Sequence, residues 1–126
     1  MTLKQEENTI GKTGEKTAAD FLKKNKYLIL ERNFRTRNGE IDIVAIDKSE
    51  KDHVLAFVEV KTRSSDVFGT PFEAITPWKL KFLIRAAQFY KLTHKNLPGA
   101  MRIDAVSVEL HETGEPEIEL MKNISG

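Results

Sequence analysis

The sequence predicts one α/β domain in which two helices flank a mixed β-sheet. Segments with apolar residues at helical spacing alternate with β-rich runs in the order helix, three strands, helix, two strands. The chain has 126 residues, enough to bury one hydrophobic core, and its 40% apolar content is typical of globular domains. We therefore expect a single domain over residues 1–126, with residues 1–9 as a flexible N-terminus.

The first helix is predicted over residues 10–25. Ala18, Phe21 and Leu22 supply an apolar stripe at i, i+3 and i+4, and lysines occupy the other faces. Runs rich in β-branched and aromatic residues predict strands over 27–34, 40–47, 54–61, 101–110 and 117–121. The last of these follows a turn at Gly114 and is expected to pair back as an edge strand.

The second helix has a clear predicted start. Thr76 is a favourable N-cap and Pro77 suits the first helical position, so the helix is expected to run from there to about Leu92. Its core-facing stripe is Leu80, Leu83, Ile84 and Ala87. Residues 62–76 before it are predicted to be an ordered loop that contains Gly69.

Composition excludes several classes of protein. Without cysteine, the chain can form neither a disulfide nor a thiolate nucleophile. The net charge of +1 is not that of an architectural DNA-binding protein, although acidic metal ligands can offset a local basic patch in the sum. The N-terminal residues lack an apolar signal-peptide core, and no apolar run approaches the roughly 20 residues of a membrane span. We expect a cytoplasmic protein without membrane contact.

Two of the predicted strands carry acidic residues inside apolar runs. In the second strand, Glu40 and Asp42 share one face, because side chains alternate along a strand. In the third strand, Glu59 and Lys61 share a face in the same way. Buried charges are costly to desolvate unless they bind one another, bind a metal or take part in chemistry. These two strands therefore hold the candidate site.

The loop between the two strands suggests how they pair. If the polar loop 48–53 is centred on its midpoint, an antiparallel hairpin places Asp42 opposite Glu59 and Glu40 opposite Lys61. Residues directly opposite have Cβ atoms about 4.5–5.5 Å apart. This register is a hypothesis, because a slip of one residue would move the whole set to the other face.

Converging carboxylates indicate a particular chemistry. Together with a main-chain carbonyl and waters they form a hard-oxygen set, which suits Mg²⁺ or Mn²⁺ better than zinc. A lysine beside such a metal can orient a water and stabilise charge at a phosphate, which indicates phosphodiester hydrolysis. The alternative is a structural ion pair, either Glu40–Lys61 or Glu59–Lys61. One pair does not, however, need three or four charges in strands this apolar.

The same residues resemble the Asp…Glu-x-Lys core of the PD-(D/E)XK nuclease superfamily, whose core order is helix, three strands, helix, strand. The closer resemblance is to the YraN-type family of bacterial proteins, which are generally treated as endonucleases. It runs over roughly residues 11–108 and rests on an ordered series of residues. The series is Gly14-Glu15, Ala18, Phe21-Leu22, Asn33, Gly39-Glu40-Ile41-Asp42, Phe57-Val58-Glu59-Val60-Lys61-Thr62-Arg63, Phe68-Gly69, Lys79 and Arg102-Ile103-Asp104.

The resemblance implies a restriction-endonuclease-like fold and roles for the matching residues. It implies that Asp42 and Glu59 hold Mg²⁺ or Mn²⁺, with the peptide carbonyl of Val60 as a further ligand. Lys61 falls on the catalytic lysine, and Glu15 on a first-helix glutamate that resolvase-like members use. The proline of the superfamily's name is absent before the aspartate, which is a common departure.

Other charged residues are candidates for supporting roles. Glu40 is interpreted as an ion-pairing residue beside the metal ligands. The candidates for nucleic-acid contact are Arg35, Arg37, Arg63, Ser64 and Lys79. A solvated position is the alternative for the two arginines that precede the second strand. Arg102 and Asp104 share a strand face and are interpreted as a structural ion pair.

The second helix also carries aromatic and basic residues. Trp78, Phe82 and Phe89 recur at helical spacing and are interpreted as core or an oligomer contact, rather than as platforms for base stacking. Lys81 and Arg85 are interpreted as a solvated face.

The leading hypothesis is a metal-dependent endonuclease that hydrolyses DNA phosphodiester bonds. Resolvase-like relatives suggest branched or structured DNA and a homodimer, and RNA stays open as a substrate. One alternative is a catalytically inactive protein that has a nuclease fold and binds nucleic acid. The other is a protein-interaction module that uses the aromatic face of the second helix.

Overall fold

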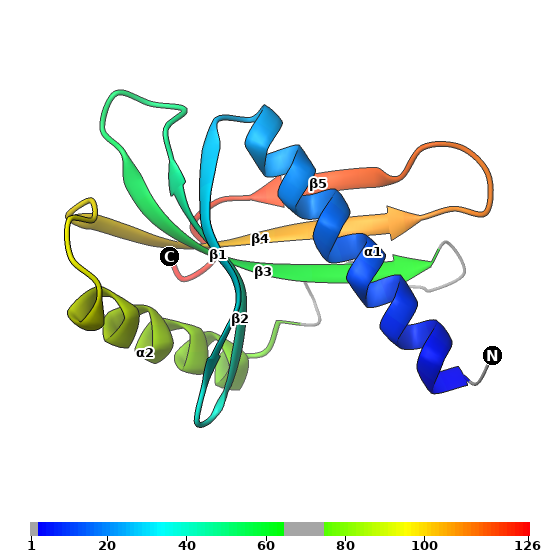
Figure 1. The fold of residues 1–126 in the computed structure, drawn as a ribbon, viewed down its shortest axis with the longest axis horizontal. Coiled ribbons are helices and arrows are strands. Elements are labelled where there is room, and N and C mark those ends of the chain that lie inside the picture. The colour runs from blue at the N-terminus through cyan, green and yellow to red at the C-terminus, as the bar shows by residue number, and fades with distance from the viewer. Residues whose placement is uncertain (1–2, 65–74) are drawn as a thin grey trace.

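The computed structural model describes residues 3–64 and 75–126. Two helices and five strands follow one another in the predicted order, and the fold is the expected α/β type (Figure 1). The elements are α1 (Leu3–Lys24), β1 (Tyr27–Thr36), β2 (Gly39–Asp47), β3 (Val54–Ser64), α2 (Pro77–Thr93), β4 (Ala100–Leu110) and β5 (Glu117–Met121). This order is consistent with a restriction-endonuclease-like core.

The sheet is mixed, with its strands in the order β1-β2-β3-β4-β5. Among the described strands, only β3 and β4 pair in parallel, and α2 lies in the crossover between them. The other neighbours are antiparallel, and β5 lies at the edge beside β4, as the sequence predicts. Figure 1 shows α1 crossing one face of the sheet and α2 lying on the other.

Each helix closes its own hydrophobic core. On the α1 face, Ala18 and Leu22 pack against inward residues of the central strands, and both are fully buried. On the α2 face, Leu83 packs with Phe57, and both are fully buried as well. The sheet is therefore covered on both sides, which explains why its central strands read as nearly continuous apolar runs.

The first helix is longer than its apolar pattern predicts. It begins at Leu3 instead of residue 10, so residues 3–9 extend the helix at its N-terminal end. These residues lack an apolar stripe, and Lys, Gln and Glu favour helix by propensity alone. Apolar periodicity therefore could not indicate the first turns of this helix.

The third strand also exceeds its prediction. It continues to Ser64, three residues into the predicted loop, because its parallel pairing with β4 runs on to the pair Ser64 and Leu110. Arg63 and Ser64 thus lie in a strand, which corrects their expected position in a loop. The rest of that loop, including Gly69, lies outside the described residues.

The start of α2 matches the prediction. Thr76 is the N-cap, and its side chain accepts a hydrogen bond of 3.1 Å from the Lys79 N–H. Pro77 occupies the first turn, where its missing N–H costs nothing. The helix ends at Thr93, one residue beyond the predicted end. Neither of the described helices combines the length and apolar character that a bilayer crossing requires.

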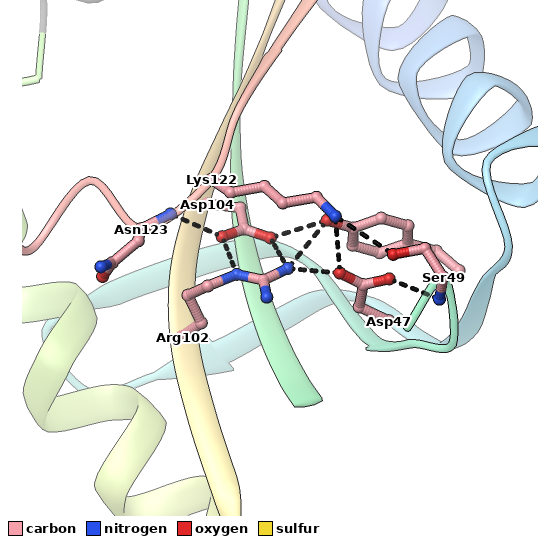
Figure 2. A network of polar contacts seen from close by, with 7 residues as sticks. Asp47, Ser49, Arg102, Asp104, Lys122 and Asn123 are labelled. Carbon is pink, nitrogen blue, oxygen red and sulfur yellow. Dashed lines mark hydrogen bonds and ion pairs between the residues drawn. The ribbon is translucent and has the colours of Figure 1, made fainter. Parts of the chain in front are cut away.

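A buried network of charges joins β1, β2, β4 and the chain after β5 (Figure 2). Arg102 donates to Asp104 through Nε at 2.7 Å and to Asp47 through Nη2 at 2.6 Å. The Tyr27 hydroxyl donates to Asp104 at 2.9 Å. The predicted Arg102–Asp104 ion pair is confirmed, and the structure adds partners that the sequence analysis missed.

The C-terminal segment completes this network. Lys122 Nζ lies 3.0 Å from Asp47 Oδ2, and the Asn123 N–H donates to Asp104 at 3.0 Å. Burial raises the pKa of Asp47, but hydrogen bonds from Ser49, Arg102 and Lys122 outweigh it and hold the pKa well below its usual range. Asp47 therefore stays ionised, and both aspartates have hydrogen-bond partners inside the fold.

We expect Arg102→Met to destabilise the protein strongly. The change leaves Asp47 and Asp104, which are 3% and 0% exposed, without their shared cation. Removing one partner of a buried ion pair costs about 3–5 kcal/mol, measurable as a lower urea midpoint. Lys16→Ala is the control, because it breaks a solvent-exposed pair with Asp20 and should leave the midpoint almost unchanged. Equal midpoints for wild type and Arg102→Met would contradict the role of the network.

Candidate active site

The pairing of β2 with β3 confirms the predicted register from Asp47 to Ile43, but the ladder ends before the predicted pairs of Asp42 with Glu59 and of Glu40 with Lys61. The paired residues run from Asp47 and Val54 to Ile43 and Val58, so the hairpin is centred where the loop pattern places it. Asp42 is the next residue in register, but its backbone leaves the ladder. Figure 1 shows the β1–β2 hairpin turning away from β3 beyond this point. The candidate site lies where the two strands separate.

Where the strands separate, a side-chain oxygen replaces a main-chain carbonyl as the hydrogen-bond acceptor of a β3 N–H. The Val60 N–H donates to Asp42 Oδ2 at 2.8 Å. The carboxylate therefore satisfies a strand N–H that would otherwise need a main-chain acceptor. This bond fixes Asp42 against the middle of β3 and holds it in a half-buried position.

Three carboxylates converge at the same place. Glu15 of α1 and Glu40 and Asp42 of β2 each offer an oxygen, and these oxygens all lie within 4.8 Å of one another. With its amide nitrogen turned toward the acids, Asn33 donates to Glu15 Oε1 at 2.8 Å and to Glu40 Oε1 at 2.7 Å. Asn33 has φ +56°, a left-handed conformation that asparagine tolerates. Its amide thus bridges an acid of the helix and an acid of the sheet.

The position of Glu15 depends on the glycine before it. A Cβ on Gly14 would lie 2.6 Å from the Thr62 Cβ, so only glycine lets α1 approach β3 this closely. The close approach brings the following residue, Glu15, to the start of β2. Gly14 therefore has a packing role that the resemblance alone does not explain.

Glu59 lies between two lysines and is almost fully buried. Its side chain is 6% exposed, with Lys61 Nζ 3.6 Å from Oε1 and Lys79 Nζ 3.7 Å from Oε2. The Oε2 atom accepts no hydrogen bond. Lys61 comes from the same strand, whereas Lys79 comes from the first turn of α2. Glu59 thus contacts one lysine that precedes the β3–α2 connection and one lysine that follows it.

The carboxylates raise one another's proton affinity. Burial, followed by the charge of Asp42, raises the pKa of Glu59 to about 7, although Lys79 and Lys61 oppose the shift. Burial also raises the pKa of Asp42, against the hydrogen bond from Val60. Burial and then Asp42 raise the pKa of Glu15. The site therefore has more negative charge than its lysines neutralise, and a bound cation would relieve the excess.

The structure gathers most of the predicted site residues. Glu15 and Asp42 converge with Glu40, and Glu59, paired with Lys61, lies near enough to Asp42 to feel its charge but outside the set of oxygens within 4.8 Å of one another. Of the two structural ion pairs that the sequence left open, Glu59–Lys61 is the one that forms. The residues next to this group are placed as follows: Glu40 pairs with Arg35 at 3.2 Å, and Val60 contributes its N–H to Asp42.

The predicted phosphate contacts are spread more widely. Lys79 joins the site as a partner of Glu59, a contact the sequence analysis missed. Arg35 lies in β1, Arg37 in the hairpin turn, and both line a neighbouring groove. Arg63 and Ser64 continue β3 beyond Lys61 and are half-buried.

The donor set fits a hard divalent cation. Every carboxylate in the site offers oxygen, and no histidine joins the cluster among the described residues. Carboxylate oxygens are preferred ligands of Mg²⁺ and Mn²⁺. The buried Glu59 oxygen without a hydrogen bond is an atom that a cation could use. The arrangement is therefore suited to binding a metal beside two ammonium groups.

Proteins of several bacteria are similar in sequence to this chain over most of its length. A protein-family model described as "Uncharacterised protein family UPF0102" matches residues 14–108, which include every residue of the candidate site. A UPF0102 protein of Leifsonia xyli is 41% identical over 115 residues, covering 91% of this chain and 94% of that protein. One of Clostridium perfringens is 39% identical over 122 residues, covering 96% and 97%. One of Syntrophomonas wolfei is 47% identical over 115 residues, covering 90% and 95%.

We expect Gly14→Ala to destabilise the protein by about 1–3 kcal/mol, because the new methyl group must push α1 away from Thr62. Gly11→Ala is the matched control on the same helix. Its Cβ would meet nothing within 4 Å, so helix propensity should raise the stability by up to about 1 kcal/mol. Urea unfolding measures both effects. Similar midpoints for the two variants would show that the close approach of α1 is unimportant.

Without metal, the protein should lose stability as the pH rises. Glu59 holds its proton more tightly in the folded than in the unfolded chain, so protonation favours folding. The contribution is complete below the ordinary pKa of 4.5 and is lost as the pH rises through the folded pKa of about 7. This contribution to the free energy of unfolding is on the order of 3 kcal/mol. It belongs to Glu59 and Asp42 together, because the two carboxylates interact and titrate as a pair.

The measurement is urea unfolding in EDTA at about pH 5 and about pH 8. Glu59→Gln, which cannot ionise, should show a much smaller difference between the two conditions than the wild type. The same difference in both proteins would mean that Glu59 does not titrate in this range.

Proposed function

The chain belongs to the UPF0102 family, the YraN-type family that its sequence resembles, and on this premise we propose that it is a metal-dependent endonuclease acting on DNA. The observation that carries the proposal is the cluster of carboxylates and lysines where β2 leaves β3. Three acids from α1 and β2 converge there, and Glu59 of β3 lies nearby between two ammonium groups. A structural ion pair does not require such an excess of acid.

Asp42 and Glu59 are the proposed metal ligands, with the Val60 carbonyl as the third protein ligand. The hydrogen bond from the Val60 N–H holds Asp42 in place, and the burial of Glu59 excludes water from its Oε2. A divalent cation bound there would supply Lewis-acid chemistry, activating a water and neutralising charge at the phosphate.

The two lysines have separate proposed roles. Lys61 lies 3.6 Å from Glu59, and its proposed role is to orient the attacking water and stabilise the developing negative charge. Lys79 lies on the other side of Glu59, and its proposed role is to contact a phosphate oxygen. Both side chains are about one third exposed, so solvent and substrate can reach them.

Glu15 and Glu40 complete the proposed site. Burial and then the charge of Asp42 raise the pKa of Glu15, which favours a role in proton transfer, and we assign it an assisting role in catalysis. Glu40 is held by Arg35 and Asn33 and acts by keeping the other acids in position. The remaining proposed contacts to the DNA backbone are Arg35, Arg37, Arg63 and Ser64. We place this activity in the cytoplasm, with a homodimer as the proposed assembly.

A second candidate function is favoured by one observation. Glu59 is already flanked by two lysines, as in a purely structural charge cluster. A protein of this kind would bind DNA in a salt-dependent manner without cutting it. Binding in EDTA combined with no turnover in Mg²⁺ or Mn²⁺ would identify this case.

We expect the wild-type protein to cut DNA in Mg²⁺ or Mn²⁺ and to stop when EDTA is added. Lys61→Ala and Asp42→Asn should each lower the single-turnover rate by about 100-fold or more, because each removes charge stabilisation in the transition state. Labelled branched, single-stranded and duplex DNA, separated on denaturing gels, provide the measurement.

Lys23→Ala is the matched control, since Lys23 is an exposed lysine near the end of α1. This variant should cut at the wild-type rate. Cleavage by Lys61→Ala at the wild-type rate, or no cleavage of any substrate in either metal, would refute the proposed activity.

A further inference from the structure

A groove opens between the β1–β2 hairpin and α2, next to the candidate site. It has a volume of about 880 Å³. Figure 1 shows the tip of the hairpin beside the N-terminal end of α2. Four of the described residues that line the groove are cationic, and none of the described lining residues is acidic. The cations are Arg35, Arg37, Lys81 and Arg85.

The same groove contains exposed aromatic rings. Trp78 is 82% exposed and Phe89 is 53% exposed, and both lie on α2. The sequence favours core or an oligomer contact for these rings, but their exposure shows that they are not core. Flat aromatic surface beside several cations is the combination by which proteins hold a single nucleic-acid strand.

The groove is continuous with the site through three contacts. The Phe82 ring lines the groove and lies 5.2 Å from Lys79 Nζ, which in turn pairs with Glu59. Phe82 also packs against Gly39 at the start of β2, where a Cβ would lie 2.9 Å from the ring. Arg35 pairs with Glu40 of the carboxylate cluster. A strand in the groove would therefore lead directly to the acids.

We propose that this groove holds an unpaired DNA strand, with bases stacked on Trp78 and Phe89 and phosphates on the cations. This inference rests on the proposed function and names its substrate class, which is DNA with a single-stranded segment next to the bond that is cut. A base offers its face for stacking only when it is unpaired. Duplex DNA could contact the cations, but it could not use the rings.

The charge of the groove argues against a second copy of this chain as the occupant. In a symmetric dimer the same patch lies on both subunits. The cations of one groove would then face the cations of the other, with no acid among the described lining residues to compensate. A polyanion satisfies the same groove without this repulsion.

Trp78 provides a direct test, because it is the only tryptophan in the chain. A mixed-sequence DNA oligonucleotide of about 16 nucleotides is titrated into the protein in EDTA, so that binding is measured without cleavage. Single-stranded DNA should quench the tryptophan fluorescence and bind more tightly than the duplex of the same sequence. Trp78→Ala should weaken single-strand binding, followed by anisotropy, by roughly 5- to 150-fold, and Trp78→Phe by less.

Leu92→Ala is the matched control. Leu92 is 86% exposed on the same helix but does not line the groove, so this variant should bind as the wild type does. Unchanged fluorescence, equal binding of duplex and single strand, or wild-type affinity in Trp78→Ala would overturn the proposal. A dimer in sedimentation that Trp78→Ala dissociates, with no effect on DNA binding, would overturn it too and would identify an interface between copies.

The two proposals fail in different ways. Single-strand binding that depends on Trp78, without cleavage in either metal, would support the proposed binding groove and refute the endonuclease activity. Cleavage of duplex DNA at the same rate by wild type and Trp78→Ala would support the endonuclease activity and refute the binding groove.

Discussion

The hydrogen bond from the Val60 N–H to the Asp42 carboxylate is the interaction on which the candidate site depends. It ends the β2–β3 ladder with a side chain in place of a backbone carbonyl. This allows the hairpin to turn away from β3 without leaving a buried N–H unpaired. Where the strands separate, the middle of β3 is left accessible to side chains from α1 on one face and from α2 on the other. Glu15 and Lys79 can therefore reach the acids of the sheet from opposite faces.

Two buried charge clusters in residues 3–64 and 75–126 differ in how fully their acids are hydrogen-bonded. In the cluster around Arg102, each aspartate has several donors, and the pKa of Asp47 is held low. In the cluster around Glu59, one oxygen has no hydrogen bond and the pKa is raised to about 7. Full satisfaction is typical of a structural role, and incomplete satisfaction is typical of a site that binds something else. This contrast within one sheet supports the proposal that the cluster around Glu59 binds a cation, whereas the cluster around Arg102 stabilises the fold.

The strand register and the core of the site could be predicted from the sequence, because both follow from local rules. The loop 48–53 is short and polar, so its centre fixes the register. Lys79 as a partner of Glu59 could not be predicted, because it depends on how α2 docks after a long connection. The contact of Gly14 with Thr62 also requires the packing angle of α1. The early start of α1 had no apolar periodicity to indicate it.

The parallel pairing of β3 with β4 has a consequence for the order of folding. The β1–β2–β3 meander is joined by short connections and can form from local contacts, whereas the parallel pair must await closure of the α2 crossover. Until then, Glu59 has beside it only the ammonium group of Lys61 from its own strand, and that of Lys79 is missing. A partly folded chain would therefore carry a larger excess of acid at this place, which disfavours contact with a phosphodiester backbone. Affinity for a polyanion would thus increase when α2 docks.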